Sequence, residues 1–236
     1  MSTISVDLAY RSYADIGIAV VEGSQRALSV RFRRDRPEAQ PEPRALATFL
    51  VALCQDEGSK TLLLDGPQGW KASSNGLEHS RRCERALNTP AKSGLPGNVK
   101  PRNYGRFVEF SIAVFDALAD LGWARYTGEQ SSVACVVFES FPFSAWRALK
   151  LLPIPAKRRC GEAVLTESAS ALRATRNISF SCAPSHDELQ ALVAGLAGPA
   201  LEARDLSAFE RFGVPPFVQE GSYREGFIVN PRPPTI

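Results

Sequence analysis

Carboxylates stand inside or at the end of three apolar segments of this sequence. Asp7 lies in SVDLAY, Asp65 ends the run LLLD before a Gly-Pro pair, and Glu139 follows an apolar run in VVFES. Asp is disfavoured inside a strand, and like charges brought close together raise one another's pKa, so such a cluster is unfavourable unless a cation binds there. Mg²⁺ prefers oxygen ligands and keeps waters and phosphates in its shell. If the three strands are neighbours, the sequence therefore predicts a site for Mg²⁺ or Mn²⁺.

A fourth carboxylate, Asp187, opens the predicted helix in SHDELQALV, one helical turn from the same edge of the sheet. His186 beside it is a candidate proton shuttle or phosphate-positioning residue. Each residue also has a structural interpretation. Asp65 can start a turn, Glu139 can cap the helix that follows it, and the Asp187 segment has the composition of any helix start. The residues alone leave both interpretations open.

Basic residues are concentrated in two stretches, 80–106 and 140–161, and each stretch follows an acid-bearing strand. The residues predicted to bind substrate are Arg82, Arg85, Lys100, Arg102, Lys157 and Arg158. A phosphodiester substrate requires positive charge in this position, although a solvated basic surface explains either stretch taken singly. Tyr104, Trp70 and Trp146 are candidates for stacking on bases, but aromatic residues at such spacings are more often part of a core.

The elements that must position these side chains follow from the apolar pattern. Strands are predicted at 4–10, 16–23, 26–32, 61–65 and 132–140, and helices at 44–58, 76–88, 106–123, 142–152, 161–174 and 185–204. The first three strands have short connections and must form an antiparallel meander. A helix precedes each of the last two strands, which allows a parallel crossover. The predicted fold is α/β: a mixed five-stranded sheet, three antiparallel strands and then two parallel, flanked by helices.

Length and composition indicate one domain over residues 1–236, because 236 residues with 44% hydrophobic and 22% charged residues suffice for one sizeable core. Within it, the Pro- and Gly-rich segment 89–105 is predicted to be a long mobile loop, and 217–230 a small C-terminal hairpin. Five scattered cysteines predict reduced thiols. The first residues lack the pattern of a signal peptide and no apolar run is long enough for a membrane helix, so a cytoplasmic protein without membrane contact is expected.

The motifs, taken in order, resemble the ribonuclease-H-like superfamily and, more narrowly, the domain-of-unknown-function 429 family of predicted nucleases. The matching segments are DLAY, LLLDGPQGW, RRCERAL, SIAVFDAL, VFESFPFSAWRAL, HDELQALVAG and EGFIVNP. The resemblance implies that Asp7, Asp65, Glu139 and Asp187 form the catalytic, metal-holding set. In such sites two metal ions about 4 Å apart activate the attacking water and stabilise the leaving oxygen.

This chain departs from the best-known ribonuclease-H pattern, which places a glutamate early in the helix between the third and fourth strands. Here that helix offers only Asp56 and Glu57, at its far end. The arrangement is closer to the resolvase branch of the superfamily, and a resolvase-like role predicts a homodimer. The number of metal ions, one or two, therefore stays open.

The expected function is that of a metal-dependent nuclease or phosphodiesterase acting on DNA or RNA. An ATP-dependent phosphotransferase of the actin or sugar-kinase type opens with the same meander, but it needs glycines in the first hairpin so that backbone N–H groups can approach phosphates. This chain has Tyr10, Arg11 and Tyr13 there, which argues against ATP. A non-catalytic nucleic-acid-binding protein, with a vestigial acidic edge, is the remaining alternative.

Overall fold

The central sheet has the predicted strand order. The computed structural model describes residues 2–24, 26–37, 40–129 and 135–233. An antiparallel meander is formed by β1 (Ser2–Asp7), β2 (Gly17–Ser24) and β3 (Ala27–Phe32), and β4 (Thr61–Asp65) and β8 (Val136–Ser140) follow in parallel beside β1. The order β3-β2-β1-β4-β8 confirms the mixed, ribonuclease-H-like sheet. Residues 132–134 of the last predicted strand lie outside the described residues.

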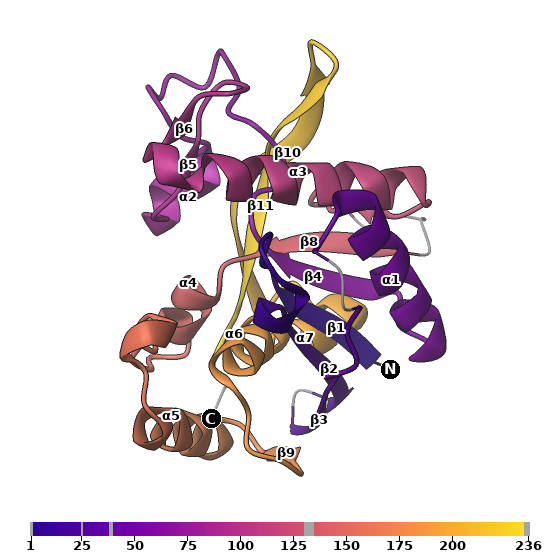
Figure 1. Ribbon diagram of the computed structural model, residues 1–236, viewed down its shortest axis with the longest axis vertical. Helices are drawn as coiled ribbons and strands as arrows, with labels where there is room; N and C mark the ends of the chain where they lie inside the picture. The colour runs from indigo at the N-terminus through magenta and orange to yellow at the C-terminus, as the bar shows by residue number, and fades with distance from the viewer. Residues whose placement is uncertain (1, 25, 38–39, 130–134, 234–236) are drawn as a thin grey trace.

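The sheet continues beyond the five predicted strands at both ends. A short strand, β9 (Ile178–Phe180), pairs with β3, and β7 (Ala124–Arg125) pairs with β8. The C-terminal hairpin of β10 (Phe209–Gln219) and β11 (Ser222–Pro231) is larger than expected, and β11 joins β8 in parallel. Figure 1 shows this hairpin, in yellow, projecting past α3. The C-terminal segment is thus part of the sheet that carries the acidic residues.

Helices cover both faces of the sheet. On one face, α1 (Pro43–Asp56) and α3 (Gly105–Asp120) pack on side chains such as Ile4 and Leu62. On the other face, α6 (His186–Gly195) and α7 (Gly198–Glu202) pack against β1 and β2. The predicted helix 185–204 is therefore two helices, which break ahead of Pro199 because proline is tolerated only in the first turn of the second one. Among the described residues, no helix has both the length and the apolar composition needed to cross a bilayer.

Two further regions flank the edge where β1, β4 and β8 end. Residues 66–104, called the insert below, contain α2 (Arg82–Leu87), the paired strands β5 (Lys92–Ser93) and β6 (Val99–Lys100), and the 3-10 turn η2 (Arg102–Tyr104). The other region contains α4 (Pro142–Ala148), η3 (Lys157–Arg159) and α5 (Glu162–Thr175). In Figure 1 the insert lies above α4 and α5 on the same side of the molecule. Part of the segment predicted as a loop is thus a two-stranded sheet.

Candidate metal site and substrate cavity

Asp7 and Asp65 lie side by side at the carboxyl ends of two neighbouring parallel strands. They are register partners in the pairing of β1 with β4, and Ser140 is the partner of Asp65 in the pairing of β4 with β8. Residues in register on adjacent strands point to the same face of a sheet. The two carboxylates and the Ser140 hydroxyl therefore form one row, and a hydrogen bond joins the two carboxyl groups.

Both carboxyl groups of this pair have raised pKa values. Burial, then the charges of Asp65 and Asp187, raise the pKa of Asp7 well above its ordinary value. Burial raises the pKa of Asp65 to about 7. The hydrogen bond with Asp7 acts against this rise, and the charge of Glu139 adds to it. Because two close carboxylates resist ionising together, the pair holds a proton near neutral pH. A divalent cation between them would remove the need for that proton.

Asp187 is brought over Asp7 by the way in which α6 begins. The helix starts with a capping box: the Ser185 hydroxyl accepts from the Glu188 N–H at 3.2 Å, and the Glu188 carboxylate accepts from the Ser185 N–H at 2.7 Å. Gly17, the register partner of Asp7, lies under this turn. A Cβ atom at Gly17 would lie 2.0 Å from the backbone oxygen of Asp187, so only glycine lets α6 approach this closely.

The side chain of Asp187 is already paired. The Lys157 ammonium donates to it at 2.5 Å and to Asp15 at 2.8 Å. His186 contacts Asp187 through Nδ1 at 3.0 Å and the Pro155 carbonyl through Nε2 at 2.9 Å. Burial alone would raise the pKa of Asp187, but the hydrogen bonds from His186 and Lys157 hold it below its ordinary value. Both ring nitrogens of His186 are engaged, so its predicted proton-shuttle role would require one of these contacts to open.

Glu139 faces away from the Asp7–Asp65 row. Its register partner on β4 is Leu64, and the partner of Leu64 on β1 is Val6. The side chains of Leu64 and Val6 belong to the core under α1 and α3, so Glu139 is on that face of the sheet. The Glu139 carboxylate is held by Arg81 through two hydrogen bonds of 2.6 and 2.7 Å and by the Gln68 N–H at 3.0 Å. Strand alternation thus separates Glu139 from the other predicted ligands. The buried guanidinium, 1% exposed, neutralises it.

A cavity of about 490 Å³ opens over the ends of β1, β4 and β8. The residues that line it include Asp65, Glu139 and Ser140. Its walls come from the segment after β1, from the insert and from the start of α3, and they include Arg11 and Tyr104. The candidate metal site therefore borders a space that is large enough for a single small ligand.

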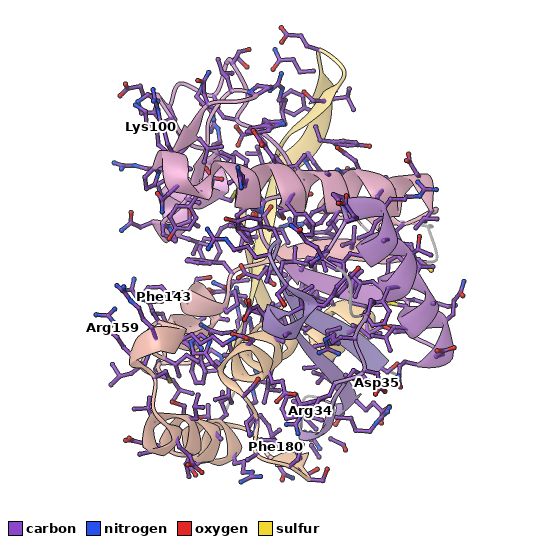
Figure 2. The ribbon with its side chains drawn as sticks, in the orientation of Figure 1. Arg34, Asp35, Lys100, Phe143, Arg159 and Phe180 are labelled. Carbon is purple, nitrogen blue, oxygen red and sulfur yellow. The ribbon has the colours of Figure 1, made fainter. Side chains whose placement is uncertain are left out.

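The predicted substrate-binding residues do not line this cavity. Arg82, Arg85, Lys100, Arg102 and Arg158 are exposed, and the Lys157 side chain is about half exposed. Lys100 contacts His79 on the insert. Figure 2 shows Lys100 on the insert and Arg159 near α4, both on the side of the molecule where the two regions face each other. The basic residues thus occupy the outer surfaces beside the cavity.

Sequence reasoning missed three residues that shape the site. Arg81 lies within the basic stretch 80–106, yet it is buried, pairs with Glu139 and is the first residue before α2. Gly17 and Ser140 carry no motif of their own, although a glycine that opens a β-branched strand is a signal of close backbone approach. The pairing of Ser140 with Asp65 depends on register, which the sequence does not specify.

Among the described residues, no group of three or more His, Cys, Asp or Glu side chains is arranged to hold a metal ion. Two carboxylates with waters and a phosphate nevertheless match the way in which Mg²⁺ is usually bound. The strand order and this edge define an α/β protein with a ribonuclease-H-like fold and a carboxylate pair at the end of its central strands.

Comparison with known proteins adds a distant likeness. No family model matches the chain, so membership of the domain-of-unknown-function 429 family stays a prediction, and no curated protein matches it. The chain is similar to the structure of RuvC from Thermus thermophilus, with 15% identity and a TM-score of 0.44 over 86% of this chain and 97% of that one. It is also similar to T. thermophilus RuvC in complex with a Holliday junction substrate, with 15% identity and a TM-score of 0.41 over 86% and 95%. The strand order and register, rather than this likeness, define the fold.

Proposed function

We propose that this protein is a metal-dependent nuclease or phosphodiesterase that cleaves DNA or RNA. The observation that supports the proposal is the Asp7–Asp65 pair, hydrogen-bonded across two parallel strands at the edge of a cavity. Burial raises the pKa of both carboxyl groups, and the neighbouring charges of Asp65 and Asp187 raise that of Asp7 further. Such an arrangement is unfavourable for the fold alone and becomes favourable when a divalent cation replaces the proton.

Asp7 and Asp65 would hold the ion. Asp187 would become a third ligand once the Lys157 ammonium releases its carboxylate. When bound, the ion supplies the activation of a water nucleophile and the stabilisation of the leaving oxygen. Glu139 takes no part in the proposed ligand set, because its two oxygens are bound by Arg81 and by the Gln68 N–H. Whether one or two ions bind follows from the stoichiometry of a titration.

The other residues of the chain would hold the substrate. Lys157 is tethered to the edge by Asp15 and Asp187 and can exchange either carboxylate for a phosphate oxygen. The outer basic residues proposed to follow the nucleic-acid backbone are Arg82, Arg85, Lys100, Arg102 and Arg158. Such contacts position the substrate without reading its sequence. A homodimer, which stays a prediction, would carry two copies of the proposed metal site.

The test is a calorimetric titration of Mg²⁺ and Mn²⁺ into the wild type and into the Asp7→Asn, Asp65→Asn double variant, followed by a cleavage screen. Single strands, duplexes and branched junctions of DNA and RNA are the substrates. We expect the wild type to bind metal and cleave, and the double variant to do neither. Asp35→Asn, on an exposed loop, is the matched control and should behave as the wild type. Equal binding by the wild type and the double variant, or binding by neither, contradicts the assignment.

A further inference from the structure

The cavity beside the carboxylate pair has aromatic walls. Tyr10 follows β1, Tyr104 and Phe107 lie at the start of α3, and Phe141 follows β8, so the rings come from three separate segments of the chain. All four side chains are only partly buried. Aromatic rings normally contribute to stability by being covered, so four partly exposed rings around one space indicate a surface that a planar ligand would cover.

Polar groups also line this space. The Ser140 hydroxyl is buried, with the residue 1% exposed, and within the described part of the chain it has no hydrogen-bond partner. It lines the cavity beside Asp65, its register partner. At another point of the wall, the Arg11 side chain donates through Nε to the Tyr10 hydroxyl at 2.9 Å.

We propose that the cavity takes one unstacked nucleotide of the substrate, with its base among the aromatic rings and its phosphate at the Asp65–Ser140 end. The inference rests on the proposed function and names its substrate class: a single strand, or a strand end that can leave its duplex. The volume of about 490 Å³ suits one small ligand. A base inside a duplex cannot offer its face to a ring until it is extruded. Stacking on aromatic side chains accepts any base, so little sequence preference is expected.

The test uses the full chain in Ca²⁺, with three fluorescent probes. These are a short DNA strand with one 2-aminopurine, the same strand annealed to its complement, and free 2-aminopurine nucleoside monophosphate. We expect the single strand to bind about tenfold or more tightly than the duplex, with quenching of 2-aminopurine as it stacks on a ring. Binding of the free monophosphate at a similar affinity would assign the pocket to nucleotides rather than to strands and would overturn the inferred substrate class.

The variants separate stacking from general charge attraction. Tyr104→Ala should weaken single-strand binding about tenfold, Tyr104→Phe should retain it, and Tyr10→Ala provides a second truncation on the opposite segment if the first does not fold. Phe217→Ala, a more exposed ring on β10 away from the cavity, is the control and should bind as the wild type.

The outcomes distinguish the pocket from the catalytic proposal. Equal binding of single strand and duplex, unaffected by Tyr104→Ala and Tyr10→Ala, overturns the pocket, while cleavage of either substrate in Mg²⁺ would leave the nuclease proposal standing. Ring-dependent binding of the single strand without cleavage in Mg²⁺ or Mn²⁺ supports the pocket and contradicts catalysis.

Discussion

Asp7 on β1 and Asp65 on β4 are register partners whose carboxyl groups share a hydrogen bond. The relationship places two acids that are far apart in sequence at one edge of the sheet, with Asp187 near enough to raise the pKa of Asp7. Burial and the neighbouring carboxylates make it costly for Asp7 to ionise. Variants that remove one of these charges therefore test the proposed metal site.

Asp65→Asn is expected to stabilise the metal-free protein at neutral and higher pH. The pKa of Asp65 is raised from 3.8 to about 7, so its contribution to stability is fully present below about pH 4 and is lost as the pH rises through 7. In EDTA the variant should therefore exceed the wild type by at most about 4 kcal/mol at pH 8 and by little at pH 4. Urea unfolding at both pH values measures the difference. Asp35→Asn should show no such pH dependence.

Gly17→Ala should lower both stability and metal affinity. The new methyl group would meet the Asp187 backbone at 2.0 Å, and this forces α6 away from β2. A loss of about 1–3 kcal/mol is expected from such overpacking, with weaker Mg²⁺ binding because Asp187 moves. Thermal unfolding and calorimetry check the two effects. Gly161→Ala, where the added atom has open space, is the control, and a Gly17→Ala protein with unchanged metal affinity would remove Asp187 from the proposed set.

Glu139→Gln should cost stability and spare metal binding. It removes one of the two carboxylates paired with the buried Arg81 guanidinium and leaves Glu84 in place at 3.0 Å, so we expect a loss of about 1.5–3 kcal/mol for the weakened charged hydrogen bonds. The metal affinity should stay that of the wild type, in contrast to Asp7→Asn. If the single variant fails to fold, the Arg81→Gln, Glu139→Gln double variant removes both charges. A folded variant that no longer binds Mg²⁺ would return Glu139 to the ligand set.

Lys157→Gln is expected to raise Mg²⁺ affinity several-fold and to lower the cleavage rate. The ammonium neutralises Asp187 at 2.5 Å and helps to hold its pKa down, so its removal frees that carboxylate for a cation. The same change removes a proposed phosphate contact. Calorimetry and a cleavage time course measure the two effects, with Lys60→Gln as an exposed control away from the cavity. A parallel fall of both quantities would indicate that Lys157 only braces the fold.

Arg102→Gln and Arg158→Gln should weaken oligonucleotide binding without changing metal affinity. Each lost phosphate contact is expected to reduce the slope of log affinity against log salt by about 0.7 for a single strand. Fluorescence anisotropy over a salt series measures the slope. Arg26→Gln, exposed between β2 and β3, is the control. Slopes that match the wild type would show that the outer basic residues face solvent and not the nucleic acid.

The sequence by itself determined the central architecture. β-Branched runs with short connections left only an antiparallel meander, and the helix before LLLD allowed a parallel strand beside β1. With that topology, Asp7 and Asp65 had to reach the same edge, since parallel strands place their carboxyl ends together. The sequence also determined where the helix begins at Ser185, because a capping box depends on only four consecutive residues.

Only the tertiary structure decided which carboxylates share a face. Register on β8 places Ser140, and not Glu139, in the row of Asp65, and a shift by one residue would have exchanged them. Arg81 meets Glu139 across 58 residues of chain, a pairing that no local pattern encodes. The pairing of β11 with β8 is also a long-range contact, so no local pattern in the sequence predicted it. Local chemistry fixes strands and helix starts, whereas register and long-range charge pairing depend on the packing of the whole chain.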